Sequence, residues 1–208
     1  MTILLRLMLS TIWLMAVALM LVKTYRSATV LYRIQAVAES VVAAGLAVAL
    51  HIPWLWLSAI LIVLIKGGLI PRLMARTAST HADYSAKGPL GMATLLILAF
   101  ILSAGGILLG KDSPSQPALT GLLFAALFVA FLHLSSRYEL WSLLWALLNL
   151  DTVAGAAALV FGTGLPEIAD VGINAASLGL ALVLSYLAFY IDRIKGTRDV
   201  RDLEELIG

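Results

Sequence analysis

The sequence of 208 residues contains no cysteine, and only 12% of its residues are charged. The absence of cysteine excludes disulfide bonds, thiolate metal sites and haem attachment. Soluble domains carry about 25% charged residues and about 45–50% apolar ones, whereas this chain is 62% hydrophobic. Too few charges remain to cover a water-facing surface, so the composition excludes a soluble globular enzyme. Disorder is excluded too, because it requires low hydrophobicity.

Histidine is also scarce. His51, His81 and His133 are far apart in the sequence, so we expect no metal site in this chain. The net charge of +2 is small, and nothing in it indicates a nucleic-acid partner. The position of the charges therefore carries more information than their sum.

Long apolar stretches are what the sequence has in abundance. A hydrocarbon core about 30 Å thick takes roughly 20 residues of helix to cross, and cutting the chain at its polar and Pro/Gly-rich breaks leaves seven such stretches. The sequence therefore predicts an all-α, polytopic membrane bundle over residues 1–195, followed by a short cytoplasmic tail over 196–208. The predicted spans are 3–21, 29–50, 54–75, 90–110, 117–135, 140–162 and 171–191.

The two ends of the chain allow further predictions. We expect the first stretch to be a retained helix, because no small-residue cleavage site precedes a polar mature sequence. In the tail, Val200, Leu203 and Leu206 fall at helical spacing among charged residues. This segment is either a solvated end or a short cytoplasmic helix that docks on a partner subunit.

Basic residues predict the orientation of the bundle. One side has only Arg6 and Lys111, together with the acidic Glu167 and Asp170. We therefore expect the N-terminus outside and the C-terminus in the cytoplasm, in a multi-pass protein of the plasma (inner) membrane. The other side collects Lys23, Arg26, Arg33, Arg72, Arg76, Lys87, Arg137, Arg193, Lys195, Arg198 and Arg201.

Three ionisable residues, Glu39, Lys66 and Asp151, lie near the middle of predicted spans. Each costs about 2.5–3.5 kcal/mol at a helix centre. The tight turn at 51–53 makes the second and third spans neighbours, so Glu39 and Lys66 can approach each other. A structural ion pair would explain two charges. Three charged residues at one depth favour a proton or ion relay, because burial and neighbouring charges can shift the pKa of such groups by several units.

The residues after Lys66 favour a working site. Gly67 and Gly68 follow it, and Pro71 has no N–H to donate to the Gly67 carbonyl. We expect the helix to open at Gly67, Gly68 and Pro71, with a backbone acceptor exposed beside the ammonium. Such breaks are tolerated at membrane depth where protein or water covers them. A simple proline kink is the alternative.

Other polar residues lie near these charges. Tyr32, Arg33 and Gln35 precede Glu39, and Gln35 shares its helix face at i, i+4. They form either an access path for protons or an ordinary interfacial anchor. His133 is grouped with this path, although its place near the end of the fifth span is more typical of an interfacial residue.

Asp151 has its own polar neighbours in the sequence. Asn149 and Thr152 could hydrogen-bond its carboxylate or a water beside it. Small residues that allow close helix approach follow on the same helix, namely Ala154, Gly155 and Ala158.

Several short segments carry a resemblance to a known family. They are Lys23-Thr-Tyr25-Arg26, Tyr32 with Gln35, the third span with Lys66 and Pro71, and the closing stretch from Gly196 to Leu203. In these segments the chain resembles hydrogenase-4 component E, over nearly its whole length. That family forms a small membrane subunit of formate hydrogenlyase-type and other group 4 energy-converting [NiFe]-hydrogenase complexes. It is related in part to the K-type subunit of respiratory complex I.

The sequence departs from the family pattern at three places. Lys66 falls where the family has its third-helix lysine, but Asp151 replaces an expected glutamate of a Glu-Asn-Gly stretch. Ala175-Ala176 stands where an acidic residue is expected in the last helix. Glu39 stands where close relatives are apolar, so the relay is expected to pass through the second helix. A related complex without hydrogenase chemistry remains open.

The resemblance implies a non-catalytic subunit of an oxidoreductase complex. It implies large antiporter-like membrane subunits and a peripheral hydrogenase-like arm as partners. The Ni-Fe site and the iron–sulfur clusters would lie on those partners, since no cysteine is present to ligate a cluster. A stand-alone proton-coupled secondary transporter is the alternative, although the sequence indicates no internal repeat. A light-sensing seven-helix protein is excluded, because the predicted span 171–191 has no lysine for a Schiff base.

Overall fold

The computed structural model describes residues 2–77, 90–113, 116–162 and 167–195, and every described span is helical. Seven helices in this part are long and apolar enough to cross a membrane, which confirms an all-α, multi-pass fold. The predicted tail over 196–208 lies outside the described residues. The elements are α1 (Thr2–Leu21), α2 (Tyr25–Leu50), α3 (Trp54–Ile62), the π-helical segment η1 (Val63–Leu69), α4 (Ile70–Thr77), α5 (Met92–Gly110), α6 (Pro117–Ser135), α7 (Leu140–Phe161) and α8 (Glu167–Lys195).

Two helices begin earlier than predicted. α2 begins at Tyr25 instead of residue 29, because Thr24 caps it: the Thr24 hydroxyl accepts a hydrogen bond from the Ser27 N–H at 3.3 Å. Such a cap satisfies a backbone donor at the helix start. α8 begins at Glu167 instead of residue 171 and continues to Lys195. It is therefore longer than its apolar stretch.

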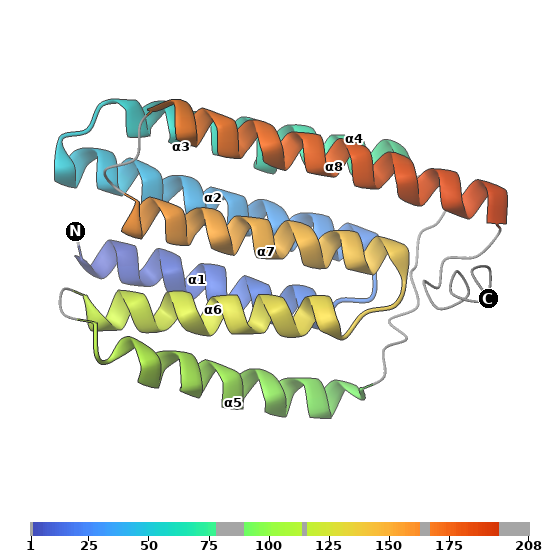
Figure 1. Cartoon of the computed structure of the whole chain (residues 1–208), viewed down its shortest axis with the longest axis horizontal. Coiled ribbons are helices and arrows are strands. Elements are labelled where there is room, and N and C mark those ends of the chain that lie inside the picture. Colours follow the sequence, from blue (N-terminus) through green and yellow to red (C-terminus); the bar gives the residue numbers. More distant parts are fainter. Residues whose placement is uncertain (1, 78–89, 114–115, 163–166, 196–208) are drawn as a thin grey trace.

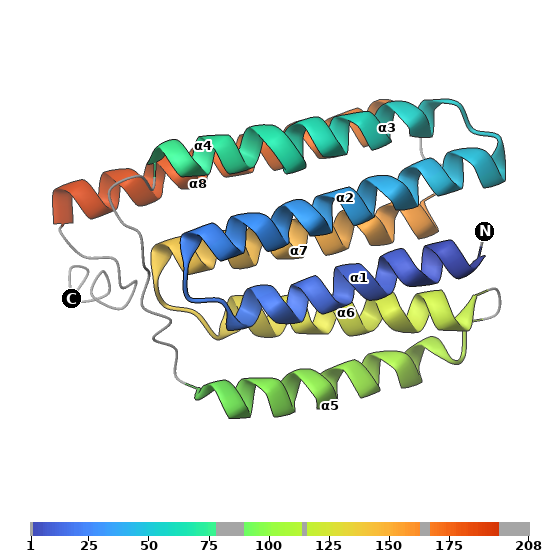
Figure 2. The same cartoon turned by 180° about the vertical axis from the view of Figure 1, so that it is seen from behind.

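The helices form two rows that lie side by side (Figures 1 and 2). In chain order, α1, α2 and the third span (α3–η1–α4) make the first row, and α6, α7 and α8 make the second. Helices at the same place in each row pack together: α1 on α6, α2 on α7, and α3, η1 and α4 on α8. α5 packs against α6 and lies at the edge of the bundle. The α2–α7 pair is therefore the middle layer.

The two rows also run in the same directions. In Figure 1, α1 and α6 run from left to right, α2 and α7 return, and the third span and α8 run from left to right again. The two rows are therefore related by a translation. They are not related by a twofold rotation about the membrane normal, because that rotation would place α1 beside α8 instead of beside α6. This repeated arrangement was not apparent in the sequence.

The ends of the helices agree with the predicted alternation of crossings. At one end, called here the basic end, α1 finishes, α2 begins, α4 finishes and α6 turns into α7. Arg137 lies in that last turn and donates a hydrogen bond from Nη2 to the Met20 carbonyl, which ties the turn to the end of α1. Arg6 lies towards the opposite end, on the first turns of α1. The basic residues therefore gather at one end of the bundle.

Close packing between α5 and α6 depends on glycine. A Cβ at Gly106 would lie 2.7 Å from the Ala125 Cα, and the atoms it meets belong to the α6 backbone, which cannot move aside. Small residues allow membrane helices to approach this closely. A side chain at Gly106 would therefore push the two helices apart.

We predict that Gly106→Ala lowers the stability of the purified protein by about 1–3 kcal/mol, the usual effect of overpacking. The measurement is thermal unfolding in detergent. Gly105→Ala is the matched control, because a Cβ at Gly105 meets nothing within 4 Å. Equal unfolding temperatures for the two variants would show that α5 is not held by this contact.

Candidate functional site

A cluster of three charged side chains from three elements lies where the middle layer meets the third span. Lys66 on η1 donates hydrogen bonds to Glu39 on α2, with Nζ 2.9 Å from Oε1 and 3.2 Å from Oε2. Nζ is also 3.2 Å from Oδ2 of Asp151 on α7. We call these three residues the charge cluster. The sequence predicted their common depth, and the structure brings all three into contact.

The three members differ in their access to the outside. The side chains of Glu39 and Lys66 are 1% exposed, whereas that of Asp151 is 19% exposed. Removing a charged group from water carries a penalty of several kcal/mol per ion, which only close pairing offsets. Asp151 is therefore the open member of the cluster, and Glu39 is the member that is sealed inside it.

The element that carries Lys66 is a π-helix. Seven residues from Val63 to Leu69 adopt it, and the Ile70 N–H bonds to the Ile65 carbonyl, five residues back. The chain stays helical through Gly67, Gly68 and Pro71, so the structure differs from the expected opening. The missing donor at Pro71 is accompanied by a widened turn directly before it. Such π-segments are rare and occur frequently at functional sites.

Gly155 makes room for the cluster. A Cβ at this position would overlap with Oε1 of Glu39 and would lie 3.0 Å from Nζ of Lys66. Of the small-residue face predicted on α7, Gly155 therefore faces the charges. Ala154 is exposed on the other side of the helix. The absence of one side chain on α7 lets the ion pair of α2 and η1 lie against it.

Ser177 on α8 completes the surroundings of Asp151. Its Oγ donates to Oδ1 of Asp151 at 2.9 Å and lies 3.0 Å from the Ile173 carbonyl of its own helix. Ser177 was not predicted from the sequence, because a serine in an apolar helix usually bonds its own backbone. Ala175 and Ala176, where the family pattern leads one to expect an acid, are both exposed on the outside of α8. The polar position of α8 that reaches the cluster is therefore Ser177.

A second polar chain crosses the bundle through the same two central helices. Gln35 on α2 donates from Nε2 to Oδ1 of Asn149 on α7 at 2.8 Å. The Asn149 amide nitrogen lies 3.3 Å from Nδ1 of His133 on α6. All three side chains are buried. We call this the amide–imidazole chain. His133 is therefore buried inside the bundle, near the end of α6.

Two residues that were expected to hydrogen-bond Asp151 bond other groups. Asn149 belongs to the amide–imidazole chain, because two residues along an α-helix correspond to about 200° of rotation, which places it on the opposite face of α7. Thr152 donates from Oγ1 to the Leu148 carbonyl of its own helix at 3.1 Å. Neither replaces Ser177 and Lys66 as the contacts of the carboxylate.

The residues of the predicted access path lie in different surroundings. Tyr32 is fully buried, and its ring lies against Trp145 with the ring centres 5.6 Å apart. Tyr32, Gln35 and Glu39 lie at i, i+3 and i+7, and so follow one another along one face of α2. Arg33 is exposed and does not face this interior. The polar face therefore leads from the half of α2 nearest the basic end towards the charge cluster, without the arginine.

The charge cluster consists of groups that can bind and release protons. Within residues 2–77, 90–113, 116–162 and 167–195, no group of three or more His, Cys, Asp or Glu side chains could hold a metal ion. With both carboxylates ionised and Lys66 charged, the cluster has a net charge of −1, and one proton makes it neutral. Carboxylates and amines in contact can take up, hold and pass on a proton.

Comparisons with known proteins give no further guide. No protein-family model, no curated protein and no solved structure matches the chain. The class of protein that the fold defines is a multi-pass membrane protein with an ionisable cluster inside the bundle. The function must be argued from that cluster.

Proposed function

We propose that the chain is a membrane-arm subunit of an energy-converting [NiFe]-hydrogenase or complex I-like assembly, of the hydrogenase-4 component E kind. In this proposal it holds neighbouring antiporter-like subunits together and relays protons through the charge cluster. The single observation that carries the proposal is the contact of Lys66 with both Glu39 and Asp151 inside the bundle. Such groups are expensive in a membrane and usually mark ion or proton pathways.

The geometry suggests how one ammonium can serve two carboxylates. Lys66 lies within 3.2 Å of both Glu39 and Asp151, so a small movement of Nζ changes which carboxylate it neutralises. The carboxylate that loses contact with the ammonium then binds a proton more readily, and the carboxylate that keeps this contact binds a proton less readily. A charge that changes in a neighbouring subunit would bias this choice, which is coupling between two sites in the thermodynamic sense.

Protons need a route to the cluster. Asp151 is partly exposed at the surface of the chain, and in this proposal it connects the cluster to a neighbouring subunit. On the other side, Tyr32 and Gln35 line α2 towards Glu39. The amide–imidazole chain adds His133, which can carry a proton on either ring nitrogen. We assign this face of α2 as the access path from the basic end.

The remaining parts of the proposal follow from the sequence. The excess of basic residues at one end supports a cytoplasmic location for that end, with the N-terminus outside, in the plasma (inner) membrane. Large antiporter-like subunits and a peripheral hydrogenase-like arm are the proposed partners. The Ni-Fe site and iron–sulfur clusters are assigned to those partners, since this chain has no cysteine.

A stand-alone proton-coupled secondary transporter is the second candidate, and the repeated rows of helices favour it. Transporters with parallel repeats relate them by an axis along the membrane normal and place their substrate between them. Here each helix of the first row packs directly on the corresponding helix of the second row. The space between α2 and α7 is filled by fully buried side chains, namely Tyr32, Gln35, Trp145 and Asn149. The relay subunit is therefore preferred.

The test begins with purification in mild detergent from the native membrane. Co-purification with large hydrophobic subunits supports the relay subunit, and four nickel-ligating cysteines on a partner would support hydrogenase chemistry. A chain that purifies alone as a stable, transporting species would overturn the proposal in favour of the transporter.

We predict that Asp151→Asn lowers proton pumping by the reconstituted assembly by about a hundredfold, the lower end of the usual range for a positioned proton-transfer group. The amide oxygen can still accept from Ser177, so stability should change little. Asp112→Asn, an exposed carboxylate in the turn after α5, is the control. Wild-type pumping by Asp151→Asn would reduce Asp151 to a packing residue.

A further inference from the structure

A groove lies between α4 and α8, away from the charge cluster. Its volume is about 330 Å³. It begins at Leu69, the last residue of η1, and runs along both helices. The groove is lined by Leu69, Arg72, Leu73, Arg76, Leu178 and Leu182.

The lining has two different parts. Four leucines give it an apolar wall, and two arginines supply positive charge. Arg72 and Arg76 lie four residues apart, so they are neighbours on one face of α4. Both are exposed, and they lie in the last two turns of the third span, where that helix reaches its end. The groove is therefore apolar at membrane depth and cationic at the membrane surface.

This pattern matches an amphiphile with an anionic head. Guanidinium groups present a planar set of donors that fits phosphate oxygens. Basic pockets between membrane helices bind the head groups of anionic lipids. A free phosphate would use the arginines but would leave the leucine wall unoccupied. A lipid chain would cover that wall.

We propose that the α4–α8 groove is a binding site for an anionic phospholipid, with its phosphate at Arg72 and Arg76 and an acyl chain along the leucines. The occupant would touch Leu69 and so contact the element that carries Lys66. A lipid seated there would brace η1 against α8.

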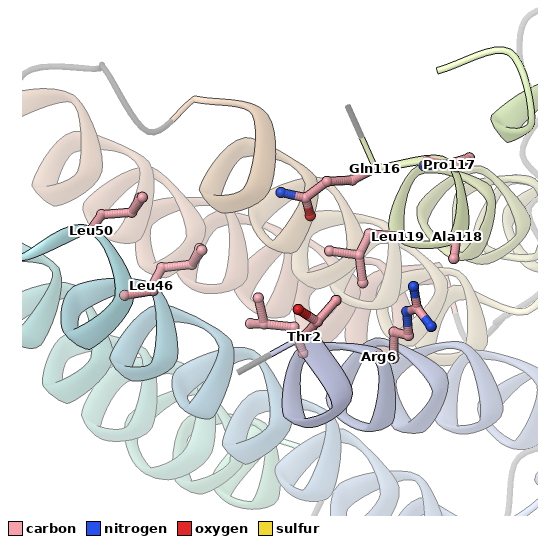
Figure 3. A pocket seen from close by; sticks show the side chains of 10 residues that line it. Thr2, Arg6, Leu46, Leu50, Gln116, Pro117, Ala118 and Leu119 are labelled. Carbon is pink, nitrogen blue, oxygen red and sulfur yellow. The ribbon is translucent and has the colours of Figure 1, made fainter. Parts of the chain in front are cut away.

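A second groove provides an internal comparison. It lies among α1, α2 and α6, with a volume of about 350 Å³, and Figure 3 shows Arg6 and Gln116 among its lining residues. Arg6 is its single basic residue, and the arginine pair of the first groove has no counterpart there. Removal of Arg6 therefore removes one cation from a lipid-facing cleft without changing the α4–α8 groove.

The experiment measures lipid binding to the purified full chain in mixed micelles doped with phosphatidylglycerol or phosphatidylcholine, by native mass spectrometry. We expect preferential binding of phosphatidylglycerol, and about 25-fold weaker binding for the double variant Arg72→Gln/Arg76→Gln, since each basic residue contributes about fivefold. Arg6→Gln should leave this binding within about twofold of the wild type. Equal binding of the two lipids, or no loss in the double variant, would overturn the proposal.

The acyl chain is tested separately. Leu182→Trp fills the groove and leaves both arginines in place, so it should weaken binding about tenfold, whereas Val183→Trp on the neighbouring, 65% exposed position should not. Soluble glycerol phosphate is the second probe. If it displaces phosphatidylglycerol completely, or if Leu182→Trp binds as well as the wild type, the site recognises only a free phosphate and the proposal is wrong.

Discussion

Lys66→Met should lower proton-coupled turnover of the assembled complex by about a hundredfold, the scale of a positioned proton-transfer group. Lys66 provides the ammonium that contacts both Glu39 and Asp151. Methionine has a similar length and no charge, so neither carboxylate can be neutralised in turn. The measurement is proton pumping by the purified assembly in vesicles, with subunit content checked on the same sample. Full coupled activity would remove Lys66 from the mechanism.

A matched double variant separates the relay from simple stability. Removing one partner of a buried ion pair costs about 3–5 kcal/mol, because the other charge stays buried without a partner. Glu39→Gln/Lys66→Met removes both charges of the 2.9 Å pair. Asp151 loses its ammonium, but it is 19% exposed and still accepts from Ser177, so the double variant should recover part of the unfolding temperature. Pumping should remain low in the double variant. Recovery of pumping together with stability would identify the pair as a packing device.

Gly155→Ala should lower pumping by roughly tenfold to a hundredfold, because a misplacement of about 1 Å at a reacting group can have that effect. The added methyl group would overlap with Oε1 of Glu39 and crowd Nζ of Lys66. The atoms it meets are the ends of flexible side chains, so the cluster can move aside at little cost in stability. We therefore expect a functional loss that exceeds the loss of unfolding temperature.

The control for this variant is Gly179→Ala on α8. A Cβ at Gly179 meets nothing within 4 Å, and alanine favours a helix over glycine by about 1 kcal/mol. Pumping and stability should both stay at or above the wild-type level. If Gly155→Ala pumps as well as Gly179→Ala, the close approach of α7 to the ion pair has no part in the relay.

The fold was largely predictable from local composition. A stretch of about 20 apolar residues has few alternatives to a membrane-spanning helix, because every backbone polar group must be satisfied within it. The helix ends were less predictable, since α2 and α8 extend into polar sequence beyond the predicted spans. There a capping side chain such as Thr24 decides the boundary, and hydrophobicity does not report it.

The candidate site was predictable in part for a similar reason. Glu39, Lys66 and Asp151 stand out because charges are rare at mid-span, and their common depth follows from the rise of the helix. Ser177 and the interior position of His133 did not stand out. A single serine or histidine in an apolar helix is compatible with a lipid-facing, an interfacial or a buried position. Which of these it occupies depends on the rotation of its helix, which the sequence does not give.

The sequence by itself determined the seven helices, the gathering of basic residues at one end and the depth of the three charges. The tertiary structure decided which faces meet: the two parallel rows, the widened turn at Lys66, and the space at Gly155 that lets α7 lie against the ion pair. The physical reason is that insertion into a membrane depends on hydrophobicity summed along each helix. Contact between helices depends on rotation and close packing, to which residues distant in the sequence contribute together.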